Sequence, residues 1–445
     1  MKINMPEPVK QIISRLSASG YEAYAVGGCI RDSITGAVPN DWDICTSALP
    51  EQVEAVFSDM HIIETGLQHG TVTLMINHVG YEITTYRTEG TYSDRRKPDY
   101  VSFVTDLRED VNRRDFTINA MAYNDENGLR DYFGGTEDLK ARIIRCVGTA
   151  DERFNEDALR ILRAMRFAAA FDFEIEEKTA LAMHRNRELL SYVSMERIAV
   201  ELLKLLKGSG AARILREFSD ILAVVIPEIT PCIGFEQHSK WHCYDVWEHT
   251  LHAIDAAEPG ELIRLTMLLH DIGKPECYTY TDGEGHFYDH ANASERIAKT
   301  VLKRLKLSNE IIGTVCALVK HHDAYGQIGE KGIKRLLNRI GMKNARRLLM
   351  VTYADMCGQA PEKRMLKEEK LEYVRTVLDK IEENNECVNV KSLAVNGRDM
   401  ISLGLKGREI GDALNLALNA VIDEKVKNEK TALMEYLTNT ELRKH

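Results

Sequence analysis

The spacing of apolar residues predicts short helices and strands that alternate over the first 145 residues. Val9, Ile12, Ile13 and Leu16 recur at helical intervals and predict a helix over residues 5–20. Alternating apolar and polar residues predict a hairpin of two strands with a turn around Asn77–Gly80. Further elements are expected as strands at 24–26, 41–44, 71–76 and 81–86, and as helices at 31–35, 49–57 and 116–122. This mixture predicts an α+β domain with a small mixed sheet.

The pattern after residue 189 is almost wholly helical. Segments such as MERIAVELLKLL and AARILREF carry apolar stripes, and we find neither a parallel βαβ pattern nor a phosphate-binding G-x-x-x-x-G-K-[ST] loop. A chain of 445 residues exceeds the size at which one core keeps growing. We therefore expect a head over residues 1–145, followed by an all-α neck over 146–210, body over 211–360 and tail over 361–445.

Composition is typical of a globular protein. Hydrophobic residues make up 44% and charged residues 28% of the chain, and no apolar run is long enough to span a membrane. The first residues lack the apolar stretch of a secretory signal. The nine cysteines include no C-x-x-C pair, which argues against a disulfide framework or a zinc–thiolate site. We expect reduced thiols in a cytoplasmic protein.

The distribution of charge matters more than its sum. A net charge of −10 counts against a nucleic-acid partner, but basic residues gather between residues 87 and 114 and again between 153 and 166. These two clusters favour contacts with a nucleotide or with RNA.

The stretch Tyr24–Ile44 combines three features in a fixed order. An apolar run ends in Gly27-Gly28, Arg31 follows, and Asp41 and Asp43 stand one residue apart. Paired glycines let backbone N–H groups approach an anion, and alternate residues of a strand share one face. Two hard oxygen ligands suit Mg²⁺, which leaves other positions to water and phosphate. This order predicts a metal–triphosphate site, with an ordinary turn and solvated carboxylates as the alternative.

Neighbouring segments supply further candidates. Glu82, in the second strand of the hairpin, either points to the same face as Asp41 and Asp43 as a third carboxylate or faces solvent. Arg113 and Arg114 precede a predicted helix, where cations oppose the macrodipole and could instead hold phosphate oxygens.

Residues 155–169 predict a helix with Asn155 as its N-cap and arginines along one side. Asp157, Arg160, Arg163 and Arg166 recur every third residue, opposite an apolar stripe. An acid and a guanidinium one turn apart offer an acceptor and donors that can read the edge of a nucleobase. The alternative is an exposed, ion-paired face.

Histidine and aspartate residues at the ends of several predicted helices form a third cluster. Such side chains, arriving from different helices, predict a mononuclear or dinuclear metal site. The candidate ligands are His249, His270, Asp271, His290, His321, His322 and Asp355.

Two other stretches are less specific. TEGTYSDRRKPDY, residues 88–100, is polar and basic without periodicity and predicts a mobile loop. Gly397, Gly404, Gly407 and Gly411 interrupt apolar residues near the end, where turns that contact a phosphate chain and plain helix connections fit equally well.

Several of these stretches together resemble the bacterial class II tRNA nucleotidyltransferases. This family comprises the CCA-adding enzymes, which are related to bacterial poly(A) polymerase within the DNA polymerase β superfamily. Between residues 21 and 206 the family's motifs are matched in order by GG-x-x-RD with NDWDICTS, RRDFTINAMAYN, EDALRILRAMRF and ERIAVELLKLL. Residues 249–355 resemble the signature of HD-type phosphohydrolases.

The resemblance implies a polymerase-β-like head that adds C, C and A to tRNA 3′ ends from CTP and ATP without a nucleic-acid template. It makes Asp41 and Asp43 the Mg²⁺ ligands, and Gly28, Arg31 and Arg114 contacts to the nucleotide. Asp157 and Arg160 then pair with the incoming base, and Arg163 and Arg166 make phosphate and fold contacts.

The HD resemblance makes His249, His270, Asp271 and Asp355 the main ligands of a second divalent metal. It adds His290 and either His321 or His322 as the extra ligands of dinuclear members. A phosphohydrolase activity and a tRNA-binding tail are the corresponding expectations.

Three alternative functions remain open at this stage. The first is an enzyme that adds only A or only CC, although the intact 88–100 stretch argues against a CC-only enzyme. The second is a poly(A) polymerase, and the third is an HD hydrolase with an RNA-binding head. The sequence leaves the oligomeric state open.

Overall fold

The structure, a computed structural model, describes residues 2–66, 70–90, 100–239, 243–326 and 328–441. Its contacts divide the chain into two compact units, residues 1–227 and residues 228–445. We call them unit 1 and unit 2. The four-part division expected from the sequence is finer and stays a prediction.

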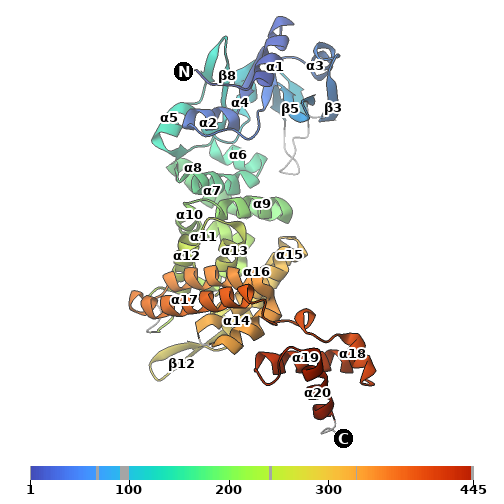
Figure 1. The fold of residues 1–445 in the computed structure, drawn as a ribbon. Coiled ribbons are helices and arrows are strands. Elements are labelled where there is room, and N and C mark those ends of the chain that lie inside the picture. Colours follow the sequence, from blue (N-terminus) through green and yellow to red (C-terminus); the bar gives the residue numbers. More distant parts are fainter. Residues whose placement is uncertain (1, 67–69, 91–99, 240–242, 327, 442–445) are drawn as a thin grey trace. The chain divides into compact units, whose positions relative to one another are not determined.

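Unit 1 begins with a seven-stranded mixed sheet in the order β3-β4-β5-β2-β1-β8-β9 (Figure 1). The pairing of β2 with β5 is parallel, and the other neighbours in this sheet are antiparallel. The strands are β1 (Ala23–Val26), β2 (Ile44–Thr46), β3 (His61–Gly66), β4 (Thr71–Ile76), β5 (Val79–Thr85), β8 (Met121–Asn124) and β9 (Gly128–Asp131). This sheet confirms the α+β head.

Short helices and a small strand pair complete the head. Strand β6 (Arg87–Glu89) pairs with β7 (Val101–Phe103). The helices are α1 (Glu7–Ala18), α2 (Gly28–Thr35), α3 (Pro50–Val56), α4 (Leu107–Asn112) and α5 (Gly135–Ala141). A core cluster around Tyr24, Tyr86 and Val111 joins the central strands to α4.

The remainder of unit 1 is helical, as expected. Helix α7 packs closely against α9, and the two-residue strands β10 (Ile143–Ile144) and β11 (Glu174–Ile175) pair in parallel beside it. The helices are α6 (Ala150–Glu156), α7 (Leu159–Phe171), α8 (Glu177–Asn186), α9 (Met195–Leu206), α10 (Ala211–Glu217) and α11 (Ser219–Val225).

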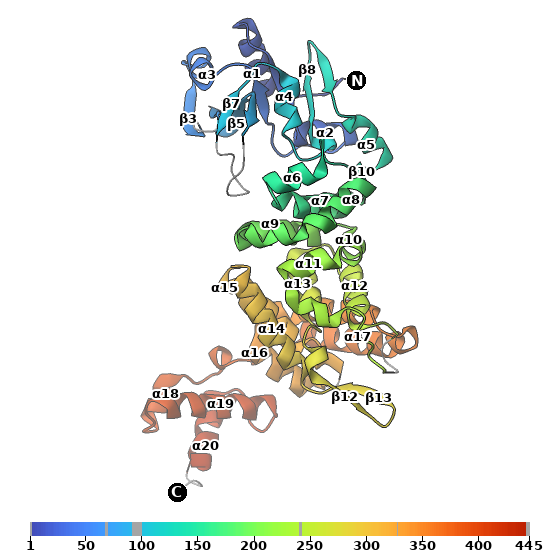
Figure 2. The ribbon, with the colours of Figure 1, turned by 180° about the vertical axis from the view of Figure 1, so that it is seen from behind.

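In its described residues unit 2 is helical apart from one hairpin, which the helical pattern of the sequence does not predict. Strands β12 (Tyr278–Thr281) and β13 (Glu284–Phe287) form this hairpin, which projects from the helices of the unit in Figure 2. Helix α16 (Glu330–Cys357) bends at Gly341, whose φ is 75°. The other helices are α12 (Val246–Ala256), α13 (Glu261–Leu269), α14 (His290–Arg304), α15 (Asn309–His321), α17 (Pro361–Glu383), α18 (Gly397–Ser402), α19 (Arg408–Ile422) and α20 (Lys430–Glu441).

Three local predictions are wrong. The helix expected over 116–122 is a 3₁₀ turn (Thr117–Asn119) followed by β8, because a sheet position overrides the weak helical spacing. Asp41 and Asp43 precede β2 rather than lying inside a strand. Asn155 does not cap a helix but lies within α6, where its amide donates to the Asp151 carbonyl.

Other predictions have mixed outcomes. The hairpin of β4 and β5 is confirmed, with positive φ at Asn77 and His78 in its turn. The ends of the 88–100 stretch belong to or adjoin β6 and β7, and residues 91–99 lie outside the described residues. Gly404 and Gly407 have positive φ in the connection between α18 and α19, around a core centred on Met400. Among the described residues, no helix is both long and apolar enough to cross a membrane.

Candidate functional site

Three carboxylates gather in the head where the start of β2 lies beside the middle of β5. The parallel register places Ile44 beside Ile83, so Asp43 and Glu82 each immediately precede one of these paired residues. Desolvation raises the pKa of the Asp43 carboxyl, and the charges of Asp41 and Glu82 raise it further, while Arg114 opposes them. Glu82 therefore lies with the two aspartates. Convergent carboxylates that disfavour one another's ionisation fit a divalent cation such as Mg²⁺.

The Gly27-Gly28 pair brings Arg114 to the same place. Gly27 has a φ of 84°, and a Cβ atom on it would lie 2.7 Å from a terminal nitrogen of Arg114. Glycine therefore permits both the left-handed backbone and the close approach of the guanidinium. Gly28 begins α2, whose first N–H groups have no acceptor within the helix. An anion at this position would meet backbone donors and a cation together.

The side chain of Arg31 lies close to the Gly27-Gly28 pair and is held by several contacts. Its guanidinium donates to Asp32 and, over 2.6 Å, to the side-chain oxygen of Asn119. It also lies 4.8 Å from the ring centroid of Phe171 and 5.3 Å from that of Phe167. The side chain thus has a fixed position and an orientation set by two helices.

The two consecutive arginines have different environments. Arg113 is bound by the buried carboxylate of Asp110, at 2.9 Å, and by Glu89, at 3.1 Å. Arg114 keeps a buried Nε atom with no hydrogen-bond partner among the described residues. The guanidinium of Arg113 is therefore already paired with carboxylates of the head. The guanidinium of Arg114 can still donate a hydrogen bond, and it lies beside the carboxylates of Asp41, Asp43 and Glu82.

The arginine face of α7 is ion-paired, and Arg160 is buried rather than exposed. Arg160 binds Glu156 at 2.5 Å and also donates to the carbonyls of Arg153 and Arg113. Asp157 accepts from the Leu159 backbone N–H and from Arg197, at 2.7 Å. Glu156 on α6 thus holds the Arg160 guanidinium, which can donate, and Arg197 on α9 holds the Asp157 carboxylate, which can accept. Their role in reading a base stays a prediction.

A chain of hydrogen bonds links this face to the glycine loop. Asn119 donates to Asp115, and Arg163 donates twice to the other oxygen of that carboxylate, at 2.6 and 2.8 Å. Glu201 on α9 then binds Arg166 at 2.5 Å and lies 3.9 Å from Arg163. Sequence reasoning did not select Asn119, Glu201 or Arg197. Their signal was present only as polar residues inside the motifs RRDFTINAMAYN and ERIAVELLKLL.

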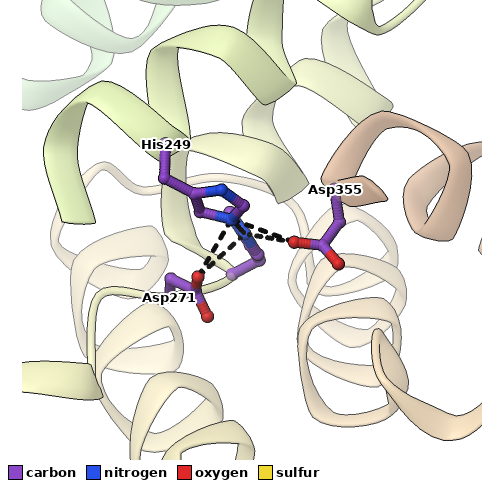
Figure 3. A group of neighbouring side chains, drawn as sticks. His249, Asp271 and Asp355 are labelled. Carbon is purple, nitrogen blue, oxygen red and sulfur yellow. Dashed lines mark hydrogen bonds and ion pairs between the residues drawn. The ribbon is translucent and has the colours of Figure 1, made fainter. Parts of the chain in front are cut away.

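In unit 2, the predicted histidines and aspartates form two groups that share Asp271. The inner group is His249, His270, Asp271 and Asp355, all buried, and three of them are labelled in Figure 3. The outer group is Asp271, His290 and His322. In each group one ligand atom per residue lies within 4.8 Å of the others. Two metal ions joined by one carboxylate would fit this arrangement.

His321 does not belong to either group. It is the last residue of α15, and His322 follows directly, about 100° further round the helix. Of these two neighbouring histidines, His322 is the one that faces Asp271, at 3.5 Å. Of the two histidines considered as alternatives, the geometry therefore selects His322.

The four histidines of the two groups all point Nε2 toward Asp271 and Nδ1 toward a backbone carbonyl. The Nδ1 atoms lie 2.7–2.9 Å from the backbone carbonyls of Gly358, Met267, Phe287 and Val319. A carbonyl only accepts, so each Nδ1 carries a proton and each Nε2 is left as the metal-binding atom. Backbone bonds of this kind commonly fix the tautomer of a metal-binding histidine.

The facing histidines of the cluster require a proton or a metal ion between them. The Nε2 atoms of His249 and His270 are 3.1 Å apart, and those of His290 and His322 are 3.3 Å apart. Two lone pairs at these distances repel unless a proton or a metal ion lies between them. Both oxygens of Asp271 are buried, and the Nε2 atoms of all four histidines lie 3.2–3.5 Å from this carboxylate, beside Lys274 at 2.6 Å. The residues present therefore fit a metal centre.

The pKa values follow the same pattern. Burial opposes protonation of His249 and His270, but Asp271 and Asp355 outweigh it and raise the pKa of each histidine to about 9. Burial also opposes ionisation of Asp271, yet His270 and Lys274 hold its pKa well below the usual range. In the absence of a metal, protons compensate these carboxylates, so metal binding displaces protons.

Two residues near the cluster were not selected from the sequence. Lys274 lies 2.6 Å from Asp271 and is buried, and Asp323 lies 3.2 Å from His290 while remaining exposed. Asp323 directly follows His322, so adjacency was an available signal. A cavity of about 240 Å³ opens on the outer group and reaches β13.

Comparisons with known proteins cover most of the chain. Residues 23–145 match the family model of the poly A polymerase head domain. Residues 172–233 match a model for an RNA- and SrmB-binding site of polymerase A, and residues 285–437 match a model for tRNA nucleotidyltransferase domain 2.

Two relatives align over almost their whole length. The chain is 34% identical to a CCA-adding enzyme of Lactobacillus delbrueckii, with 96% of each protein covered. It is 35% identical to a CCA-adding enzyme of Levilactobacillus brevis, with 98% of each covered.

Solved structures of CCA-adding enzymes also resemble this chain. The Bacillus stearothermophilus CCA-adding enzyme in complex with CTP has a TM-score of 0.73 and 30% identity, with 99% of each chain covered. The Thermotoga maritima CCA-adding enzyme complexed with tRNA has a TM-score of 0.60 at 21% identity, which shows a shared fold.

Proposed function

We propose that this chain, which belongs to the family of class II CCA-adding enzymes, adds C, C and A to the 3′ end of tRNA from CTP and ATP. The observation that carries the assignment to specific residues is the convergence of Asp41, Asp43 and Glu82 beside Arg114 and Gly27. Acidic metal ligands next to a glycine loop and a cation are what nucleotidyl transfer requires.

We further propose that Asp41 and Asp43, with Glu82 beside them, hold Mg²⁺. When bound there, the ions would activate the tRNA 3′-hydroxyl and neutralise charge on the departing pyrophosphate. Arg114 and the N–H groups at the start of α2 orient the triphosphate, and Arg31 stabilises the loop from below. Positioning and charge stabilisation are sufficient for this transfer without a covalent nucleophile.

Base selection is proposed to lie on Asp157 and Arg160. Glu156 and Arg197 fix these two side chains in place, so an incoming base would meet a rigid acceptor and donor. In this proposal Arg160→Ala loses discrimination between CTP or ATP and the other two nucleotides. Unchanged rejection of UTP and GTP by this variant would contradict the role of Arg160.

The first test is Asp43→Asn, with Glu51→Gln on an exposed face of α3 as the matched control. We expect CTP incorporation into tRNA lacking its 3′ end to fall by at least about a hundredfold. Thermal stability at pH 7 should stay equal or rise, because the folded state raises the pKa of Asp43 and so disfavours its charge. Wild-type incorporation by Asp43→Asn would refute the assignment.

One assay separates CCA addition from its alternatives. tRNAs ending in the discriminator base, in C or in CC are incubated with each labelled nucleotide, and the products are sequenced. An enzyme limited to A or to CC would extend only some of these ends, and a poly(A) polymerase would add repeated A to generic RNA.

A second candidate function belongs to unit 2. We propose that the His–Asp cluster binds two divalent metal ions and supports hydrolysis of phosphoesters. The supporting observation is the buried Asp271 carboxylate, which lies between two pairs of facing Nε2 atoms. His249, His270 and Asp355 would complete the inner position, and His290 and His322 the outer one.

Metal content tests this second function. Mn²⁺-loaded wild-type protein should retain two more ions per chain than His270→Ala/Asp271→Asn, and His290→Ala/His322→Ala should lose only one. His321→Ala is the matched control, because it lies beside His322 but outside both groups. Equal metal content in all four proteins would show that the cluster is only a buried polar core.

We also propose a cytoplasmic location, because the nine cysteines are all free thiols.

A further inference from the structure

The cavity at the outer metal position has two chemically different ends. One end is formed by His290, His322, Asp323 and the shared Asp271. The other end is formed by β13 and the turn that follows it, residues 285–288. Polar metal ligands and a wall of aromatic side chains thus face one space of about 240 Å³.

The aromatic wall is already ordered. The rings of His286 and Tyr288 are stacked, with centroids 5.4 Å apart and planes 13° from parallel. Tyr288 is 72% exposed. It therefore offers a free aromatic face at the mouth of the cavity rather than packing into a core.

Contacts on both sides fix this wall against the metal ligands. The Gly285 N–H donates to the His238 carbonyl, and a Cβ atom on Gly285 would lie 2.2 Å from the Gln237 carbonyl oxygen. The Phe287 carbonyl accepts from Nδ1 of His290. The same backbone segment thus orients an outer metal ligand and carries Tyr288.

We propose that His286 and Tyr288 form a stacking platform for a nucleobase, so that the unit 2 site takes a nucleotide phosphoester. This inference rests on the proposed metal-dependent hydrolase function. A cavity of 240 Å³ is below the usual range for a drug-sized ligand, so it accommodates a phosphate and part of a sugar. The base remains at the mouth, where stacking on an aromatic face tolerates any base.

Charge makes phosphate binding depend on metal. Asp271, Asp323 and Asp355 line the cavity, and the one lysine among the described residues that line it, Lys274, is already paired with Asp271. The phosphate therefore enters only when divalent ions offset the carboxylates. In the reaction, a water oxygen forms a new bond to phosphorus, the ester P–O bond breaks, and the released alcohol gains a proton that water gives up.

The test compares Tyr288→Ala and Tyr288→Phe with Tyr280→Ala. Tyr280 is the matched control because it is also exposed on this hairpin, at 58%, but does not line the cavity. Binding of AMP and of ribose 5-phosphate to Mn²⁺-loaded, full-length protein is measured by calorimetry. Binding that persists in His270→Ala/Asp271→Asn, which should lose both ions of unit 2, is assigned to the head and subtracted.

We expect Tyr288→Ala to weaken AMP binding about tenfold and to leave ribose 5-phosphate unchanged. Tyr288→Phe and Tyr280→Ala should bind both compounds as the wild type does. Equal weakening for both compounds, or no weakening for AMP, overturns the platform. Melting temperatures of all variants check that each protein is folded.

Hydrolysis assays keep the two proposals distinguishable. If AMP binding depends on Mn²⁺ and Tyr288 but neither compound is hydrolysed, the platform stands and the hydrolase function fails. If the wild type binds no Mn²⁺ in the cavity, both fail. Repeating the binding with single-stranded RNA that ends in a phosphate shows whether a free nucleotide or an RNA end is the better ligand.

Discussion

Asp115 illustrates how individual residues in the head fix the cations around the proposed nucleotide site. It is 8% exposed, accepts from the Phe116 backbone and from Asn119, and binds Arg163 through its other oxygen. Burial raises the pKa of this carboxyl, but Arg163 and Asn119 more than compensate and hold it below the usual value. The ionised form is thus part of the folded structure.

Asp115→Asn should reveal this as a pH-dependent loss of stability. A lowered folded-state pKa stabilises the protein above the unfolded value of about 3.9, and that contribution disappears as pH falls through the folded value. We expect the variant to be about 1–3 kcal/mol less stable at pH 7, with the difference shrinking below about pH 4. Urea unfolding across this range measures the difference.

Asp282→Asn, at an exposed turn residue of the β12–β13 hairpin, is the control and should show no such trend. A difference between wild type and Asp115→Asn that stays constant from pH 7 to pH 3 would contradict the ion-pair account.

At the scale of elements, helix α9 holds the side chains on the arginine face of α7 in place. Its Glu201 is 5% exposed and binds Arg166, while Arg197 on the same helix binds Asp157. Hydrophobic packing brings the two helices together, and these ion pairs fix the direction in which the arginine and aspartate side chains point. The residues proposed to face the nucleotide, on α7 and in the segment just before it, are therefore positioned by another helix.

Glu201→Gln tests this support. The substitution removes the charge facing two guanidinium groups but keeps an amide oxygen, so we expect about 2 kcal/mol lower unfolding free energy. The catalytic efficiency for CTP should also fall, because Arg166 loses the carboxylate that holds it and Arg163 loses a nearby negative charge. Lys204→Gln, at an exposed position of α9, is the matched control. Equal effects of both substitutions on unfolding and on CTP use would exclude a specific role for Glu201.

At the scale of the whole molecule, the chain joins two units with separate internal contacts. The proposed nucleotide site lies in unit 1, and the histidine cluster lies in unit 2. Each site is built from elements of its own unit. A ligand that binds only one of them therefore stabilises that unit directly.

Thermal unfolding should consequently show a metal-dependent transition. Mn²⁺ at about 100 times its dissociation constant should stabilise unit 2 by about 2.7 kcal/mol for each ion bound. A chelator should reverse the shift, Asp271→Asn should abolish it, and Asp43→Asn should leave it in place. Differential scanning calorimetry follows both transitions, and a shift that survives Asp271→Asn would place the ion elsewhere.

The order of chemical groups along the chain was sufficient to predict the α+β head, the helical remainder and most candidate residues. Gly27, Arg31, Asp41, Asp43 and Arg114 are recognisable because their chemistry depends on residue type and short spacing. The histidines were recognisable because they occur at helix ends, where side chains from several helices can converge.

Only the tertiary structure decided which of these groups meet. Glu82 joins Asp43 because β2 and β5 pair in parallel, and His322 rather than His321 faces Asp271 because one residue turns a helix by about 100°. The ion pairs that hold Arg160, Arg163 and Arg166 come from α6, from the segment before the 3₁₀ turn and from α9. Local sequence determines the chemistry that a side chain can offer. Long-range packing determines most of its partners, because Asp115 and Glu201 lie tens of residues from Arg163 and Arg166, although Glu156 is within one turn of Arg160.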